Sequence, residues 1–146
     1  MISRLLLVAS ILPLITCCGG DSAHSHGDSG GHAHTAPNGG KLIELGDHFA
    51  NLELLYDPGT GQVRLHVLDA HAENYARIAA PELSLERAGR PPTALQARAS
   101  DLSGERVGDC SRFEGVLEDR PAQWEARIAL IEVRGARFEQ VELGYP

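Results

Sequence analysis

The sequence predicts an all-β fold: a single antiparallel β-sandwich of immunoglobulin-like type, preceded by a signal peptide and a disordered linker. From residue 41 onward, short segments of alternating apolar and polar residues are separated by turn residues. The 146-residue chain leaves room for one domain, which we place at residues 41–146. No segment keeps a helical period for long, although residues 70–80 allow one short helix.

A hairpin opens the predicted domain. Leu52, Leu54 and Tyr56 have a period of two, the turn sequence Asp-Pro-Gly-Thr-Gly follows, and the alternation resumes at Val63. Further alternating segments lie at 83–85, 95–99, 113–117, 124–130 and 138–143. An antibody domain has two cysteines that bracket a tryptophan, whereas here Trp124 has only Cys110 nearby. The immunoglobulin-like topology therefore rests on strand number and domain size alone.

Residues 1–17 have the features of an export signal. Arg4 is their only charge, and their apolar runs are too short for a permanent membrane span. Leu-Ile-Thr-Cys at 14–17 resembles the lipobox of bacterial lipoproteins, which predicts lipidation of Cys17, or of Cys18 if cleavage falls one residue later. Ordinary cleavage near residue 19 or 20 is the alternative. The lipobox predicts a periplasm-facing lipoprotein of the cell envelope. The absence of aspartate after Cys17 favours the outer membrane under enterobacterial sorting.

The composition of residues 18–40, which is rich in glycine, serine and histidine, predicts a flexible linker. Four of the seven histidines of the chain lie in it as two H-x-H pairs, which are His24, His26, His32 and His34. Because neutral imidazole is a good ligand for divalent transition metals, these pairs predict a metal-binding segment of modest affinity. The competing interpretation is that they are solvated spacer residues.

A second candidate cluster lies at the edge of the predicted domain. Asp47 and His48 precede the first long strand, His66 is on the outward face of the next strand, and Asp69 and His71 occupy the following loop. Such nitrogen and carboxylate ligands suit divalent ions, namely Zn, Ni or Cu(II). Loop histidines can equally be hydrogen-bonded surface groups. Met1 is the only methionine, which disfavours a carrier of Cu(I).

Other classes are disfavoured by composition and context. A net charge of -7 argues against nucleic acid as a partner and leaves a lipid anchor as the expected membrane contact. The G-x-S-x-G match around Ser29 resembles the nucleophile segment of chymotrypsin-like proteases, but it lies in the linker. The H-x-E match at 71–73 lacks the cysteine pair that zinc deaminases need. We therefore expect no enzyme, and a Cys110 thiol that behaves as a small apolar group.

The segments Ala-Pro-Asn-Gly-Gly at 36–40 and Asp-Ala-His at 69–71 resemble two kinds of protein. One is a group of small uncharacterised bacterial lipoproteins; the other is the metal-binding appendages of periplasmic adaptor proteins in heavy-metal efflux systems. The resemblance covers about residues 35–80 and implies a periplasmic β-domain with a divalent-metal role. Asn38 stands where those proteins have histidine, which weakens a direct metal-binding role at this position.

Two functions follow as expectations. The first is a membrane-anchored periplasmic lipoprotein that binds or buffers divalent transition metal without catalysis, with an efflux or envelope protein as a possible partner. The second is a structural or protein-interaction module of the envelope in which the histidines are incidental.

Overall fold

The computed structural model describes residues 34–146, which fold into eight β-strands and one 3-10 helix. The strands are β1 (Lys41–Leu45), β2 (Ala50–Asp57), β3 (Gln62–Leu68), β4 (Glu82–Glu86), β5 (Thr93–Ala97), β6 (Arg112–Val116), β7 (Trp124–Val133) and β8 (Ala136–Tyr145), and the helix η1 spans Asp101–Ser103. The described part of the chain has no helix long and apolar enough to span a bilayer.

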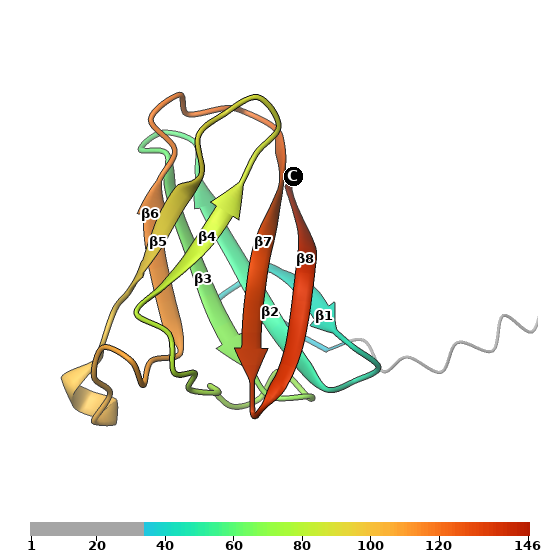
Figure 1. Cartoon of the computed structure of the whole chain (residues 1–146), viewed down its shortest axis with the longest axis vertical. Coiled ribbons are helices and arrows are strands. Elements are labelled where there is room, and N and C mark those ends of the chain that lie inside the picture. The colour runs from blue at the N-terminus through green and yellow to red at the C-terminus, as the bar shows by residue number, and fades with distance from the viewer. Residues whose placement is uncertain (1–33) are drawn as a thin grey trace, which may run out of the picture. The chain divides into compact units, whose positions relative to one another are not determined.

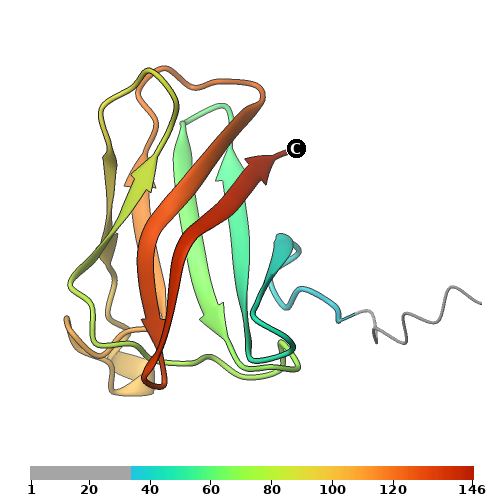
Figure 2. The same cartoon turned by 45° about the vertical axis from the view of Figure 1, so that its right-hand side comes forward.

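The strands form one antiparallel sheet in the order β1-β2-β3-β6-β5-β4-β7-β8. Figures 1 and 2 show that this sheet curls until β8 comes back beside β1, which gives a nearly closed, barrel-like shape. No strand ladder joins β1 to β8. The space between these two strands is therefore a seam in an otherwise continuous sheet.

The predicted all-β antiparallel class is confirmed, but the strand arrangement differs from an immunoglobulin-like sandwich of two separate sheets. Two short ladders account for the difference: β5 pairs with β6 through Gln96 and Ala97, and β4 pairs with β7 through Leu85 and Glu86. Each ladder contains two residue pairs. These few hydrogen-bonded positions join three groups of strands, β1-β2-β3-β6, β5-β4 and β7-β8, into one sheet, and strand number and domain size do not specify them.

The core fills the inside of the curled sheet because every second strand residue points inward. Phe113 on β6 is fully buried, together with apolar side chains from β2, β3, β4, β5 and β7. Along the seam the packing is looser: Ile43 on β1 and Phe138 and Val141 on β8 are only partly buried. The free thiol of Cys110 is fully buried, as the sequence predicts.

The predicted β2–β3 hairpin is confirmed, with its turn at residues 58–61. The Asp57 carboxylate accepts hydrogen bonds from the Thr60 hydroxyl and the Gly59 amide, and these bonds lower the pKa of Asp57. Gly61 ends the turn at φ +76°, and a Cβ there would lie 2.3 Å from the carbonyl oxygen of Leu117. Glycine is required at this position because both the backbone angle and the close approach exclude a side chain.

The short helix allowed by residues 70–80 does not form. This segment is a loop that crosses one end of the barrel and is fixed by two isolated bridges, Leu68 with Tyr75 and Ile78 with Cys110. Ala72 lies in this loop with a positive φ of 56°. Figure 1 shows the loop at the same end of the molecule as the β1–β2 turn, so residues far apart in the sequence meet there.

Candidate functional site

Three polar side chains converge at the β1–β2 turn. Glu44, Asp47 and His48 each have a possible metal-ligand atom within 4.8 Å of the others, and all three are exposed. The turn that gathers them has positive φ angles at Gly46 (65°) and His48 (51°). Glu44 fixes the turn, because its Oε1 accepts a hydrogen bond of 2.7 Å from the backbone amide of His48 and lies 3.6 Å from Nδ1 of the same residue.

Two further imidazoles reach this place from other segments. The His34 ring centroid lies 6.3 Å from that of His48 and 5.7 Å from that of His71, and both ring pairs have edge-on geometry. We call Glu44, Asp47, His48, His34 and His71 the rim cluster. It joins one histidine of the predicted linker with two of the three histidines of the predicted domain-edge cluster, His48 and His71, whereas His66 lies elsewhere. The structure thus brings together residues that the sequence placed in two separate groups.

Asp69, also predicted as a metal ligand, has its carboxylate engaged within the loop. Its Oδ1 accepts hydrogen bonds from the amides of His71 and Glu73, and its Oδ2 accepts one from the side chain of Asn74. Desolvation alone would raise the pKa of Asp69, but these hydrogen bonds outweigh it and lower the pKa. Asp69 therefore stabilises the conformation of the loop that carries His71.

A buried carboxylate holds the segment that carries His34. Glu53 on β2 is fully buried and accepts hydrogen bonds from the Asn38 amide (2.8 Å), the Asn38 side chain (2.7 Å) and the Gly40 amide (2.9 Å). The side chains of Asn38 and Tyr75 also hydrogen-bond to each other. A Cβ at Gly40 would lie 2.5 Å from the carbonyl oxygen of Leu54, so the chain approaches β2 too closely for any other residue. Residues 38–40 are therefore anchored, and Asn38 acts as a structural link.

A polar groove of about 510 Å³ lies on the outer face of β3 and β6, beside the 69–80 loop. His66 is only 7% exposed there, and its ring centroid lies 5.4 Å from that of Tyr75. Burial lowers the pKa of His66 below its ordinary value. The positive charges of Arg112 and Arg64 add to this effect, whereas the negative charge of Glu53 opposes it. The imidazole is therefore neutral at pH 7.

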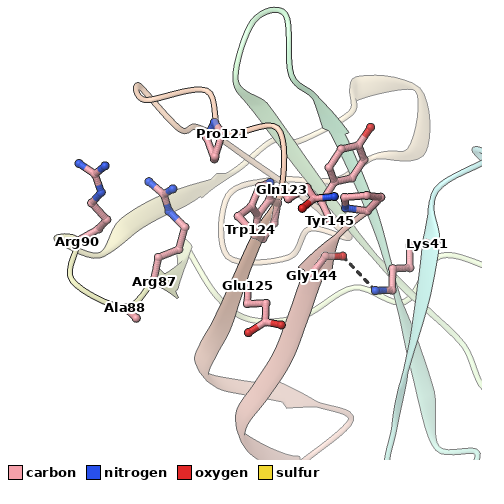
Figure 3. A pocket seen from close by; sticks show the side chains of 11 residues that line it. Lys41, Arg87, Ala88, Arg90, Pro121, Gln123, Trp124, Glu125, Gly144 and Tyr145 are labelled. Atoms are coloured by element: carbon pink, nitrogen blue, oxygen red, sulfur yellow. Dashed lines mark hydrogen bonds between the residues drawn. The ribbon is translucent and has the colours of Figure 1, made fainter.

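A second pocket, of about 600 Å³, opens at the β1–β8 seam. Figure 3 shows the Lys41 ammonium group reaching across this seam, where it donates a hydrogen bond of 3.1 Å to the Gly144 carbonyl. On the other side of the pocket, Arg87 binds both carboxylate oxygens of Asp119. The indole N–H of Trp124 is buried there without a hydrogen-bond acceptor among the described residues. None of the histidines within residues 34–146 lines this pocket.

Comparison with protein-family models, curated proteins and solved structures returned no match.

Several predicted site residues lie outside the described residues: the linker histidines His24, His26 and His32 and the two lipidation candidates Cys17 and Cys18. Glu44 and Glu53 were not singled out by sequence reasoning. Glu44 had a local signal, because it lies four residues before His48 across a glycine turn. Glu53 had none, because in the sequence it is the ordinary polar member of an alternating strand.

Proposed function

We propose that the protein binds a divalent transition metal at the rim cluster and that this binding is not coupled to catalysis. The observation that supports this most directly is the approach of His34 to both His48 and His71 beside two carboxylates. Two imidazoles on one tetrahedral Zn²⁺ have ring centroids about 5 Å apart, given metal–nitrogen bonds near 2.0–2.1 Å. The observed separations of 5.7 and 6.3 Å need only small ring movements to reach that distance.

The ligand types favour Zn, Ni or Cu(II). Imidazole nitrogen with carboxylate oxygen suits these ions, whereas Cu(I) prefers sulfur. Cys110, the sole cysteine of the described residues, is buried and donates a hydrogen bond to the carbonyl of Arg106, away from the rim cluster. Four of the ligands are exposed and His34 is partly exposed, so binding displaces water at an accessible surface and the affinity is modest. Buffering or transfer of the ion fits such a site better than permanent structural binding.

The pH dependence has a defined sign. An imidazole binds metal only in its neutral form, so the affinity falls as the pH drops through about 6.5.

Isothermal titration calorimetry with Zn²⁺, Ni²⁺ and Cu²⁺ tests the proposal. A variant with His48→Ala and His71→Ala is compared with a matched variant that carries His24→Ala and His26→Ala. We expect the first pair to lower the affinity at least tenfold and the second pair to change it little. A loss confined to the variant lacking His24 and His26 would move the site to the linker histidines, equal losses would contradict a site formed by the rim cluster alone, and no saturable binding by the unaltered protein would leave the structural or interaction module as the function.

We further propose that the protein is attached to the periplasmic side of the cell envelope by a lipid on Cys17 or Cys18. The support is the lipobox-like sequence and the short apolar run before it. An envelope or metal-efflux protein is the partner that such a location and a metal site suggest. Intact-mass measurement on protein from the membrane fraction tests the anchor, and an unmodified N-terminus would contradict it.

A further inference from the structure

The groove on the outer face of β3 and β6 has a chemistry opposite to that of the rim cluster. In the antiparallel register His66 lies opposite Arg112, and Arg64 lies opposite Glu114. Arg64 and His66 are two residues apart on one strand, so their side chains share one face of the sheet. Arg112 belongs to that same face because cross-strand partners point to the same side. We call this site, which His66, Arg64, Arg112 and Tyr75 line, the arginine groove.

Among the charged side chains that line this groove, three are arginines (Arg64, Arg77 and Arg112) and one is a carboxylate (Glu105). One carboxylate, that of Glu114, is shared by three guanidinium groups: Arg64 at 3.0 Å, Arg112 at 3.6 Å and Arg98 at 3.7 Å. Only the Arg64 contact satisfies hydrogen-bond geometry. Glu105 also lines the groove, but its oxygens already accept hydrogen bonds from the Ser100 amide and from Ser111. Glu53 lies beneath His66 and is engaged by Asn38 and Gly40.

Hydrogen-bond donors in the groove lack acceptors. The Nε atom of Arg112 is buried and has no hydrogen-bond partner within residues 34–146. A buried donor without a partner is unfavourable, and an acceptor that enters the groove would relieve this cost. The His66 ring, nine-tenths buried, likewise makes no hydrogen bond to another described side chain. Arg77 closes one end of the groove, where it binds Asp109 and the carbonyl of Ser103.

We propose that the arginine groove binds a small oxyanion, a carboxylate or phosphate group, held by the guanidinium groups of Arg64 and Arg112 and by the imidazole of His66. A planar guanidinium group matches the oxygens of either anion with two parallel hydrogen bonds. The His66 N–H adds a third donor from the floor of the groove. A groove of about 510 Å³ accommodates such an anion with part of a small organic molecule.

Titration of metal-free protein with inorganic phosphate and, separately, with acetate tests this site. The signals of the His66 ring are followed by NMR, and we expect saturable shifts with at least one anion at concentrations up to about 10 mM. The two titrations distinguish a phosphate site from a carboxylate site. No saturable shift with either anion overturns the proposal.

Two variants make the test specific. Arg112→Gln removes the unsatisfied guanidinium group and should weaken binding at least tenfold, whereas Arg127→Gln removes an exposed arginine of β7 and should leave it unchanged. Arg112→Lys keeps the charge but not the paired donors, and should weaken binding to an intermediate degree. Thermal unfolding checks that each variant is folded. Equal affinity in Arg112→Gln and Arg127→Gln would refute the assignment to this groove.

Discussion

The rim cluster and the arginine groove lie on either side of the 69–80 loop, and they use the same side chain in opposite surroundings. His48 in the rim cluster is exposed and lies beside the carboxylates of Glu44 and Asp47. His66 in the groove is buried, with the guanidinium groups of Arg112 and Arg64 near it on the groove side and the Glu53 carboxylate on the neighbouring strand β2. The charge of the neighbours, rather than the presence of histidine, determines whether such a site favours a cation or an anion.

Both regions depend on one buried residue. Glu53 anchors residues 38–40, which lie a few positions after His34 of the rim cluster. Glu53 is also the cross-strand neighbour of His66, and Asn38 joins Glu53 to Tyr75 beside the His66 ring. The two sites are therefore chemically distinct but mechanically connected, and a variant at Glu53 should affect both.

The largest effect is expected for Glu53→Gln, which tests this connection. The change removes the charge of a fully buried acceptor that receives three hydrogen bonds, and leaves an amide donor facing the donors of Asn38 and Gly40. We expect the free energy of unfolding to fall by about 2–3 kcal/mol and the zinc affinity to fall as His34 loses its anchor. Denaturant unfolding measures the first effect and calorimetry the second.

Glu139→Gln is the matched control for that experiment. Glu139 is exposed on β8 and lies 3.9 Å from Arg137, so its neutralisation should change the free energy of unfolding by less than about 0.5 kcal/mol. If Glu53→Gln were as stable as this control, the two sites would not share a support.

The burial of Glu53 is one property of the fold that could not be predicted from the sequence. Alternation located the seven strands β2 to β8 because it is a local property, and the turn sequence after Asp57 located the β2–β3 hairpin for the same reason, whereas β1 was not among the alternating segments. The same alternation marks Glu53 as an outward polar residue, and it cannot reveal that residues 38–40 cover that face. The strand order could not be predicted either, because the two short ladders β4–β7 and β5–β6 pair residues that are far apart in the sequence.

The candidate site was predicted in part. His34, His48 and His71 were singled out from residue type and spacing, and the structure places their rings near one another. The supporting carboxylates could not be ranked from sequence. Asp69 appeared to be the better ligand because it precedes His71 by two residues, yet the loop folds its backbone amides onto that carboxylate. The carboxylates that lie near a histidine in the structure are instead those of Glu44 and Asp47, beside His48.

Asp69→Ala is expected to have the second-largest effect and separates positioning from direct binding in the rim cluster. Loss of three hydrogen bonds that shape the loop should lower the free energy of unfolding by about 1–2 kcal/mol. The affinity for zinc should fall only modestly, because the His71 imidazole remains and the loop becomes less ordered. A loss of zinc binding as complete as that of the variant lacking His48 and His71 would instead make Asp69 a ligand.

Glu44→Gln tests the contribution of the carboxylates that distinguish the rim cluster from the groove. A neutral amide keeps an oxygen that accepts the His48 amide hydrogen, so the turn should remain folded. Removing one negative charge next to the metal should lower the zinc affinity about tenfold, which corresponds to about 1.4 kcal/mol. Calorimetry at low and moderate salt measures it, and an unchanged affinity would show that the imidazoles act without Glu44.

The smallest effect is expected for His66→Gln, which tests the other half of the comparison through the pH dependence of stability. The pKa of His66 is lowered in the folded protein, chiefly by burial and then by Arg112 and Arg64 against the opposing charges of Glu53 and Glu114. The unfolded chain therefore takes up a proton on this residue at higher pH than the folded protein does. Stability from this group is present above about pH 6.5 and declines as the pH falls toward the folded pKa.

Denaturant unfolding of both proteins between about pH 7.5 and pH 5 measures this contribution. The variant should lose less stability than the unaltered protein over that range, and the difference should shrink when phosphate is present, because a bound anion in the arginine groove favours the protonated imidazole. If the free energy of unfolding of the two proteins changed with pH in parallel, His66 would protonate equally well in the folded and unfolded states. The contrast between the buried imidazole of His66 and the exposed imidazole of His48 would then be refuted.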